Sequence, residues 1–399
     1  MSKLVLVLNC GSSSIKFGLF DIGHAEIPRK PRWNGKVDGI LGPNPSYGDS
    51  LTKPHQVELG SEHPYSEALR YIIDRMQAQL HGDKLAAIAH RVVHGGSRYF
   101  KPVRVDEEVL RDLRSYIPLA PLHQPFALEA IERLLEIDPG LPQVACFDTA
   151  FHHTLPEVEQ VLPLPYAAFE RGIRRYGFHG LSYEYMAVHL PELAGDRASG
   201  RVIVAHLGSG ASLCGMQNLQ SVATTMSFSA LDGLMMGTRC GALDPGVLLH
   251  MMEVEHLTPA RVGEMLYHES GLLGVSGIAS DPRVLLQREA AEPRARLALE
   301  LYVRRIVREI GAMTAALGGL DMLVFTAGIG EHNADIRQRV VQSLAFLGVR
   351  LDDAANQSHA TVISSGESAI PVLVALTNEE WMAARHTQRL LQAEGEATA

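Results

Sequence analysis

The sequence predicts an α/β protein made of two domains with similar topology. With 399 residues, the chain exceeds the size at which a single hydrophobic core stops growing, so two domains are expected. Segments with the pattern of buried strands alternate with amphipathic helical segments, which is typical of α/β folds. In addition, one strand–glycine turn–strand pattern occurs twice, and each copy opens one half of the chain.

The repeated pattern aligns without a gap. The first copy is LVLVLNCGSSSIKFGL (residues 4–19) and the second is RVIVAHLGSGASLCGM (residues 201–216). An apolar strand falls on an apolar strand, and the polar turns that follow also coincide. The alignment predicts a duplicated hairpin, and it pairs Asn9 with His206, Gly11 with Gly208, Ser12 with Ser209 and Gly18 with Gly215.

The segments after the first hairpin complete an α/β pattern. Residues 23–60 are rich in proline, glycine and polar residues, so we expect a peripheral excursion there. Residues 65–80 have a helical pattern, and LAAIAHRVVHGG (residues 85–96) is typical of a buried strand that runs into a glycine turn. Residues 125–137 begin with proline and have apolar residues at helical spacing, which predicts a helix. PQVACFDTAFH (residues 142–152) then returns to a strand and ends in polar residues.

The second half ends in a strand, a glycine turn and two helices. MLVFTAGIGEHNADIRQRVVQSLAFLG (residues 322–348) predicts the strand, the turn and a helix with a C-cap at Gly348. Such a turn directs backbone N–H groups and a helix N-terminus toward a ligand. The amphipathic segment 379–392 is expected to pack back on the first domain. The predicted N-terminal domain is therefore residues 1–149 plus 381–399, and the C-terminal domain is residues 150–380.

Composition excludes several classes of partner. The net charge of −9 argues against nucleic acid or an anionic membrane surface. No apolar run approaches the about 18 to 20 residues that span a bilayer, and the N-terminus lacks the pattern of a secretory signal. The four cysteines are scattered without metal-site spacing, which is typical of reduced thiols. We therefore expect a cytoplasmic protein without a membrane or nucleic-acid partner.

The first hairpin turn raises the question of phosphate binding. NCGSSSIK lacks the second glycine and the following helix of a P-loop. What remains is a turn that offers the hydroxyls of Ser12 and Ser14, backbone N–H groups and the ammonium of Lys16, all of which suit phosphate. The same residues also suit an ordinary hairpin. The turn alone leaves both interpretations open.

Nine motifs in a fixed order favour the phosphate interpretation. They are NxGSSSxK, HRVVHGG, PLHQP, FDTAFH, YGFHG, HLGSGAS, MMGTRCG, FTAGIGE and TNEE, spread over about residues 4–385. This series closely resembles the acetate kinase family, which includes propionate kinases and belongs to the sugar-kinase, heat-shock and actin superfamily. The resemblance implies two domains of the actin-like ATPase (ribonuclease H-like) type around an interdomain cleft, and a homodimer. It also implies reversible, direct in-line transfer of the γ-phosphoryl group of ATP to acetate, giving acetyl phosphate and ADP, with Mg²⁺ or Mn²⁺ as the metal.

The chemistry of such a reaction fits the arginines of the motifs. A carboxylate with a pKa of about 4 to 5 is already ionised at neutral pH, so it needs no strong base. The difficulty is that an anion must attack an anionic phosphoryl group, which calls for positive charge and alignment. Arg91 and Arg239 supply permanently charged, forked donors for carboxylate and phosphoryl oxygens. A surface ion pair is the alternative explanation for each of them.

The resemblance assigns three further catalytic positions. His179 in YGFHG matches a histidine that steadies the transferring phosphoryl group, and His123 in PLHQP matches a second histidine with a less defined role. Asp148 in FDTAFH matches a carboxylate that aids catalysis. We expect it to orient the nucleophile or Mg²⁺ and its water; an N-cap is the alternative. Most of the 18 histidines in the chain are expected to be structural.

The two glutamates of TNEE are predicted to differ. Thr377 and Glu380 have the T-x-x-E spacing of a capping box, so Glu380 is expected to serve the helix start. Glu379 then remains for the cleft, where it aligns with the family's metal-linked glutamate. Asn9 aligns with the other residue on the metal side. Mg²⁺ takes oxygen ligands and keeps several waters, so few protein ligands are sufficient.

The resemblance also assigns the substrate-binding positions. The acyl group is expected to lie against Val93, Leu122, Phe178 and Ala230, with Arg91 on its carboxylate. The nucleotide positions come from four stretches: Lys16; His206, Leu207, Gly208, Ser209 and Gly210; Asp281, Pro282 and Arg283; and Gly328, Ile329, Gly330, Glu331 and His332.

Several positions depart from the usual family pattern. They are Gln124, Leu181, Ser209, Ala230, Ala242, Pro282 and His332. Ala230 replaces a proline of the acyl pocket, which keeps a propionate or other short-chain fatty acid kinase as an alternative. A different class, a non-catalytic ATP-binding conformational protein, is disfavoured because such a protein has no reason to bind a small carboxylate with two arginines.

Overall fold

The computed structural model describes residues 2–11, 13–60, 62–121 and 123–398, and the chain divides into two compact units. Unit 1 comprises Met1–Ala150 and Asn378–Ala399, and unit 2 comprises Phe151–Thr377. Residues 378–380, which the sequence prediction gave to the second domain, thus group with unit 1. Within the described ranges, no helix is both long and apolar enough to cross a membrane.

Unit 1 is built on one eight-stranded sheet with the strand order β5-β4-β3-β2-β1-β6-β8-β7. Its strands are β1 (Lys3–Cys10), β2 (Ser14–Asp21), β3 (Trp33–Asp38), β4 (Ser46–Asp49), β5 (His55–Gln56), β6 (Lys84–Val92), β7 (Val103–Arg104) and β8 (Gln143–Phe147). Its helices are α1 (Pro64–Gln79), α2 (Glu107–Ser115), α3 (Gln124–Ile137) and α15 (Glu379–Thr398). The helices predicted over residues 65–80 and 125–137 are therefore confirmed.

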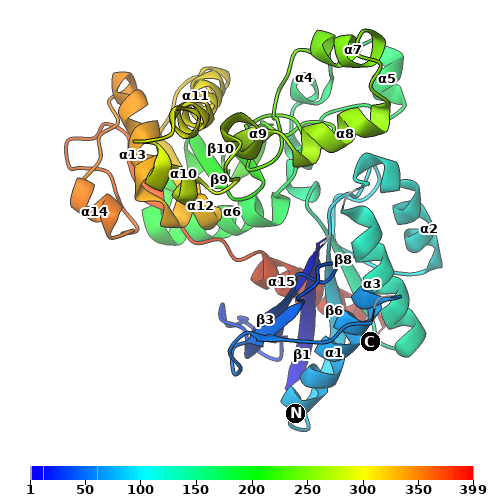
Figure 1. The fold of residues 1–399 in the computed structure, drawn as a ribbon. Helices are drawn as coiled ribbons and strands as arrows, with labels where there is room; N and C mark the ends of the chain where they lie inside the picture. Colours follow the sequence, from blue (N-terminus) through cyan, green and yellow to red (C-terminus); the bar gives the residue numbers. More distant parts are fainter. Residues whose placement is uncertain (1, 12, 61, 122, 399) are drawn as a thin grey trace. The chain divides into compact units, whose positions relative to one another are not determined.

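Helices cover both faces of the sheet in unit 1 (Figure 1). Side chains alternate along a strand, so Leu4, Leu6 and Leu8 of β1 point to one face, where they share a core with α1 and α3. The C-terminal helix α15 packs on the other face, in agreement with its expected return to the first domain. There the thiol of Cys146 contacts the carbonyl oxygen of Ala383. The central strands are thereby buried on both sides.

The segment 23–60, predicted to be a peripheral excursion, contains more secondary structure than the sequence indicated. It contains β3, β4 and β5, which extend the sheet beyond β2. Phe17, Trp33 and Tyr47 pack together on this extension, with ring centroids 4.4 Å apart for the first pair and 6.1 Å for Phe17 and Tyr47. Gly35 allows β3 to approach β4, because a Cβ atom there would lie 2.3 Å from the carbonyl oxygen of Gly48. Gly35 and Gly48, which contributed to the loop prediction, thus lie within short strands of the sheet.

Unit 2 is built on a five-stranded sheet with the order β11-β10-β9-β12-β13. Its strands are β9 (Val202–Leu207), β10 (Ala211–Gln217), β11 (Gln220–Thr224), β12 (Met322–Thr326) and β13 (Val372–Val374). Its helices are α4 (Glu157–Gln160), α5 (Tyr166–Glu170), α6 (Gly180–Ala194), α7 (Pro245–Glu253), α8 (Pro259–His268), α9 (Gly271–Ser276), α10 (Pro282–Arg288), α11 (Pro293–Ala316), α12 (Ala327–His332), α13 (Ala334–Ser343) and α14 (Asp353–Gln357). Figure 1 shows α6 and α11 on opposite sides of this sheet.

The two sheets have the same core topology, which confirms the predicted α/β class with two similar halves. In unit 1 the order β3-β2-β1-β6-β8 matches β11-β10-β9-β12-β13 in unit 2, each with an antiparallel hairpin followed by parallel strands. The gapless alignment is wrong by one residue in the second strand. Asn9 pairs with Lys16, whereas His206 pairs with Ser212, because the second turn is one residue shorter.

Candidate functional site

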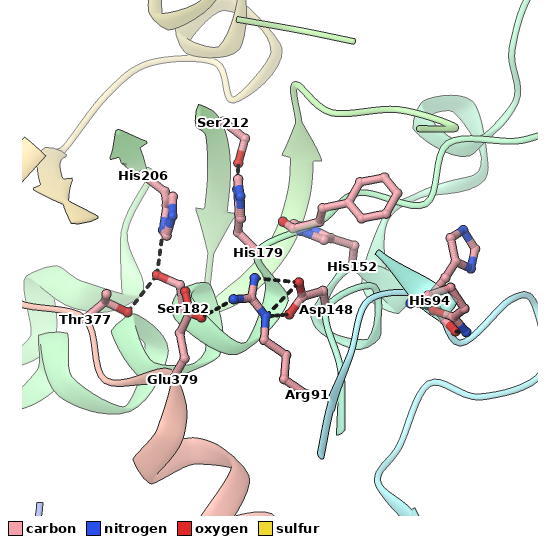
Figure 2. Close-up of polar contacts among 12 residues, drawn as sticks. Arg91, His94, Asp148, His152, His179, Ser182, His206, Ser212, Thr377 and Glu379 are labelled. Carbon is pink, nitrogen blue, oxygen red and sulfur yellow. Dashed lines mark hydrogen bonds and ion pairs between the residues drawn. The ribbon is translucent and has the colours of Figure 1, made fainter. Parts of the chain in front are cut away.

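Unit 1 holds a partly buried arginine, Arg91, between two carboxylates. The Arg91 Nε donates to both Asp148 oxygens at 2.9 and 3.0 Å, and its Nη2 donates to Asp148 Oδ2 at 2.7 Å. The Arg91 Nη1 lies 2.9 Å from Glu379 Oε2. Figure 2 shows this guanidinium held at its edges by the two acids. Topology explains the first contact, because Arg91 and Asp148 lie at the carboxyl ends of the adjacent parallel strands β6 and β8.

The electrostatics of this cluster keep the guanidinium charged. Burial by itself would lower the pKa of Arg91, but the attraction of Asp148 and Glu379 raises it on balance. The Asp148 side chain is 3% exposed and Glu379 is 15% exposed, so solvent screens these contacts weakly. A bidentate pair of this kind fixes the plane of the guanidinium as well as its charge. The alternative prediction for Asp148, an N-cap, does not fit, because its carboxylate oxygens accept hydrogen bonds from Arg91.

The capping box predicted for TNEE is wrong. Helix α15 is capped by Asn378, whose side-chain oxygen accepts from the backbone N–H of Trp381 at 3.1 Å. The N–H of Thr377 instead donates to Glu331 at 2.9 Å. Glu380 is partly buried, and this desolvation, with the adjacent Glu379, raises its carboxyl pKa. The prediction failed because asparagine is as good an N-cap as threonine and stands one residue later.

The other predicted residues of unit 1 lie around the first hairpin and α3. Asn9 and Lys16 are cross-strand partners on β1 and β2, and Ser14 begins β2. His123 directly precedes α3. Two predicted positions, Ser12 and Leu122, lie outside the described residues.

The departure at Gln124 has a structural explanation. Its buried amide accepts from the N–H of His94 at 3.1 Å and donates to the carbonyl oxygen of the same residue at 3.0 Å. The same amide nitrogen lies 3.4 Å from the Leu113 carbonyl oxygen. Gln124 therefore joins the start of α3 to the glycine turn after β6, and its side chain is committed to the backbone.

Unit 2 contains two stacked histidines held by hydroxyl groups. The rings of His179 and His206 have centroids 4.1 Å apart and planes 16° apart. Ser212 Oγ lies 2.8 Å from His179 Nδ1, and Ser182 Oγ lies 2.9 Å from His206 Nδ1. Figure 2 shows both contacts. His179 stands just before α6 with a left-handed backbone (φ 59°), and His206 is near the end of β9.

His179 and Arg239 converge on the turn between β9 and β10. A Cβ atom added to Gly210 would lie 3.3 Å from His179 Nε2 and 3.5 Å from Arg239 Nη1. Arg239 is partly buried and this desolvation lowers its pKa, and its Nη1 also donates to the Ala230 carbonyl oxygen at 3.1 Å. The glycine therefore leaves room beside two donors that an anionic group can use. A side chain at this position would fill that room.

A cavity of about 410 Å³ in unit 2 brings together most of the predicted nucleotide positions. Its predicted lining residues are Gly208, Ser209, Asp281, Pro282, Arg283, Gly328, Ile329 and His332. Ser280 and Asn333 also line it, and the sequence analysis missed both. Asn333 could have been noticed, since it precedes a helical pattern and caps α13 through the N–H of Ile336 at 3.0 Å. His206, Leu207, Gly210 and Gly330 are not among the residues that line the cavity, and neither is Glu331.

One oxygen of the Glu331 carboxylate points into the protein, and the other lies 3.6 Å from Nε2 of the cavity residue His332. The Glu331 Oε1 accepts from the N–H of Ala327 at 2.8 Å and of Thr377 at 2.9 Å, and the Thr326 hydroxyl lies 3.3 Å away. Ala327 has a positive φ of 64°, an uncommon conformation for alanine. Glu331 thus stabilises the strained turn at Ala327 that begins α12, and Gly328 and Ile329, predicted to form a glycine turn, lie in this short helix.

A buried arginine that the sequence analysis missed supports the same turn from its other end. Arg337 has 0% exposure, and its Nη1 donates to the carbonyl oxygens of Gly330 and Glu331 at 2.8 and 2.9 Å. Its Nη2 donates to the Asn356 carbonyl oxygen at 2.7 Å. Burial lowers its pKa to about 10. In the sequence, the feature that could have indicated this role is the position of Arg337 directly after Ile336, a residue of the predicted apolar stripe of α13.

The predicted acyl-pocket residues divide between the units. Val93 follows β6 in unit 1, while Phe178 and Ala230 belong to unit 2. Phe178 is 2% exposed, and the carbonyl of Ala230 contacts Arg239 as described. The acyl pocket itself stays a prediction.

Comparisons with known proteins cover almost the whole chain. The model of the Acetokinase family matches residues 4–385. The acetate kinase of Rhodopseudomonas palustris is 49% identical over 397 residues, covering 98% of this chain and 99% of that protein. The structure is similar to a propionate kinase of Francisella tularensis (35% identity, TM-score 0.89, covering 96% and 98%). It is also similar to the acetate kinase of Porphyromonas gingivalis (36% identity, TM-score 0.86, covering 98% and 100%).

Proposed function

The chain belongs to the acetokinase family, and from that premise we propose that it is an acetate kinase. It is a phosphotransferase whose acceptor is a carboxyl group. The reaction is the reversible transfer of the ATP γ-phosphoryl group to acetate, giving acetyl phosphate and ADP. The observation that carries the proposal is the convergence of His179 Nε2 and Arg239 Nη1 on Gly210, next to the cavity that Gly208 and Ser209 line.

In this proposal, the groups of unit 2 bind the nucleotide and the transferring phosphoryl group. The backbone of the glycine turns at Gly208 and Gly328 approaches the phosphates closely, as glycine allows. Arg239 and His179 donate to phosphoryl oxygens, whose charge changes as the group leaves ADP. Because Arg239 is partly buried, its interaction with an anion is stronger than in water.

The groups of unit 1 bind the carboxylate. Arg91 is the cation for acetate, and Asp148 holds its guanidinium plane. The acetate oxygen needs no base, since it is ionised at neutral pH. We therefore assign to Asp148 the orientation of Arg91 and no proton transfer. The phosphorus–oxygen bond to ADP breaks as the acetate oxygen forms its bond to phosphorus, in line and without a phosphorylated enzyme.

The residues of unit 1 fit a Mg²⁺ ion that arrives with the nucleotide. Asn9 and Glu379 offer oxygen donors, which Mg²⁺ prefers, as does Mn²⁺. Among the described residues, no three His, Cys, Asp or Glu side chains form a metal cluster. This donor set suits an ion whose remaining ligands are phosphate oxygens and water. When bound, Mg²⁺ neutralises charge on the β- and γ-phosphates.

The proposal includes a homodimer in the cytoplasm, without nucleic-acid or membrane partners. Helix α7 supports the dimer, because it is apolar and none of its residues is buried. Leu249 and, just after the helix, Val254 are 53% and 62% exposed. Exposed apolar surface of this kind marks contact sites. Sedimentation velocity of the wild type and of Leu249→Glu tests the dimer. We expect the wild type to sediment as a dimer and the variant to dissociate more readily, because the substitution places a negative charge on the apolar surface.

Trapping of the product tests the function. The protein is incubated with ATP, Mg²⁺ and acetate, propionate or butyrate, and hydroxylamine converts any acyl phosphate to a hydroxamate. We expect acetohydroxamate in proportion to ADP. Acetate is the favoured substrate over propionate because the relatives that match at 40–49% identity over nearly the full chain are acetate kinases. ADP formation without any hydroxamate would instead identify a conformational ATPase and overturn the proposal.

A further inference from the structure

Three histidines of unit 2 share one arrangement; His152 and His206 are buried, and His179 is half-buried. In each, a serine hydroxyl lies within hydrogen-bond distance of the Nδ1 atom, and a second hydroxyl or thiol contacts the serine. The three series are Tyr183–Ser212–His179 (2.5 and 2.8 Å), Thr377–Ser182–His206 (2.8 and 2.9 Å) and Cys214–Ser221–His152 (3.4 and 2.8 Å). Figure 2 shows the contacts of His179 and His206. Because the arrangement is repeated, the position of the ring proton in the His152 series indicates where the ring proton of His179 lies.

The His152 series fixes its own protons. His152 Nε2 lies 2.9 Å from the carbonyl oxygen of Phe178, and a carbonyl oxygen can only accept. Burial lowers the pKa of His152 to about 4, so the ring is neutral at pH 7. The single ring proton is therefore on Nε2, and Nδ1 must accept from the hydroxyl of Ser221. The thiol of Cys214 in turn donates to Ser221.

His179 has the same contact at Nδ1 but a different environment at Nε2. Its Nε2 faces the space at Gly210, beside Arg239, where the proposed function has a phosphoryl oxygen. Tyr183 is fully buried, and its phenol is a stronger acid than an aliphatic alcohol. The phenol is therefore the better donor to Ser212, and Ser212 can then donate to Nδ1 of the His179 ring in its neutral form.

We propose that Ser212 and Tyr183 are positioning residues that keep the proton of neutral His179 on Nε2, aimed at the transferring phosphoryl group. The inference rests on the proposed function and deepens it. The Phe178 carbonyl oxygen accepts the Nε2 proton of His152, and in this proposal a phosphoryl oxygen accepts the Nε2 proton of His179. The stacked His206, held by Ser182, keeps the ring plane of His179 in place.

Removal of the Ser212 hydroxyl has a defined consequence. Nδ1 loses its donor, so the neutral ring can carry its proton there. The lone pair of Nε2 then faces the anionic phosphoryl oxygens, which weakens transition-state binding. Loss of such a supporting contact typically costs 10- to 100-fold, and a wrong tautomer costs up to roughly 10⁴-fold. For Ser212→Ala we expect kcat to fall about 10- to 100-fold, with the KM for ATP within about threefold.

The kinetic test uses a matched control. Ser221→Ala removes the same type of hydrogen bond from a buried histidine, but His152 Nε2 meets only backbone in our account. We expect Ser221→Ala to lose stability and keep kcat within about twofold, since it touches no reacting group. Tyr183→Phe should lower kcat less than Ser212→Ala, and Ser212→Thr, which retains the hydroxyl, should restore most of it. Equal kcat values for Ser212→Ala and Ser221→Ala would overturn the proposal.

A spectroscopic test reads the proton directly. Protein with ¹⁵N-labelled histidine is examined by two-bond ¹H–¹⁵N correlation, and His179→Gln assigns the signal. We expect an Nε2–H tautomer in the wild type and a gain of Nδ1–H in Ser212→Ala, or in Tyr183→Phe if the first variant does not fold. A wild-type Nδ1–H tautomer would overturn the proposal. Failure of the proposed function would appear separately, as absence of hydroxamate from the wild type.

Discussion

The two units hold their functional cations and rings by different means. In unit 1, Arg91 is fixed by two carboxylates, at 2.7 Å from Asp148 and 2.9 Å from Glu379. In unit 2, His179 and His206 are fixed by neutral serine hydroxyls at 2.8 and 2.9 Å. The first scaffold is charged and the second is neutral.

The difference shows how each unit can treat an anionic ligand. A carboxylate that orients an arginine also cancels part of its charge, which suits the proposed role of this cluster in binding acetate and releasing acetyl phosphate. A hydroxyl orients an imidazole without adding negative charge, so the donors of unit 2 keep their full attraction for a phosphoryl group. Mutations should therefore cost folding and activity together in unit 1, and mainly activity in unit 2.

Arg239→Ala should have the largest effect on activity. The partly buried cation lies beside Gly210 with His179, where the proposed function has charge developing in the transition state. Loss of one such group typically costs about 3 kcal/mol or 10²-fold to 10³-fold in kcat. The exposed Arg350, paired with Glu367, is a matched control, and Arg350→Ala should leave kcat unchanged. A folded Arg239→Ala variant with near-normal kcat would show that this arginine is not in the site.

Asp148→Asn should lower both stability and kcat. Removing one charge from a buried pair typically costs 3 to 5 kcal/mol, and the remaining contact of Arg91 with Glu379 should bring this to about 3 kcal/mol. Urea unfolding measures the stability, and hydroxamate formation measures kcat. Asp321→Asn is the control, because Asp321 makes a similar ion pair with Arg201. The side chains of Asp321 and Arg201 are 39% and 35% exposed, so both are more than a third exposed. There we expect less than about 1 kcal/mol.

His152 should make unit 2 sensitive to acid. Its pKa is lowered from 6.5 to about 4 by burial, so the unfolded chain binds a proton more readily than the folded one between these values. Stability should therefore fall as the pH drops below 6.5, by about 2 to 3 kcal/mol at pH 4.5. His152→Gln should remove this part of the slope, while the exposed neighbour His153→Gln should keep it. Equal slopes in the two variants would mean that His152 is not held neutral.

Glu331→Gln should have a smaller effect, confined to nucleotide binding. The carboxylate supports the strained turn at Ala327, and an amide replaces charged hydrogen bonds with neutral ones. The difference is about 1 kcal/mol, so the KM for ATP should rise roughly fivefold while kcat changes little. Asp335→Asn, which alters an exposed acid near the same turn, is the control. A large loss of kcat would instead indicate that Glu331 contacts the reacting groups.

The sequence allowed the architecture to be predicted where patterns are local. The hairpin of residues 4–19 and the helix of residues 125–137 follow from apolar periodicity and from proline at the helix start. The short strands of residues 23–60 escaped, since glycine-rich edge strands have little periodicity. The one-residue shift between His206 and Ser212 also escaped, because turn length is set by backbone geometry and not by side-chain type.

For the candidate site, the sequence allowed the motifs to be identified but not the contacts between their residues. Long motifs carried Arg91, His179 and Arg239, but nothing local distinguishes Ser212 from other serines in apolar strands. Its role depends on Tyr183 and His179, which come from a different element. The orientation of Glu331 into the protein likewise depends on Thr377, 46 positions later in the sequence. Contacts between distant segments need the folded structure.

The central claim is that an acetate oxygen forms a bond to the γ-phosphorus of ATP. The most direct measurement is ³¹P NMR of a reaction with acetate labelled by ¹⁸O at both oxygens. We predict acetyl phosphate whose phosphorus signal carries the ¹⁸O isotope shift of a labelled bridge, together with unlabelled ADP. Unlabelled inorganic phosphate and ADP alone, or AMP and pyrophosphate, would contradict the account.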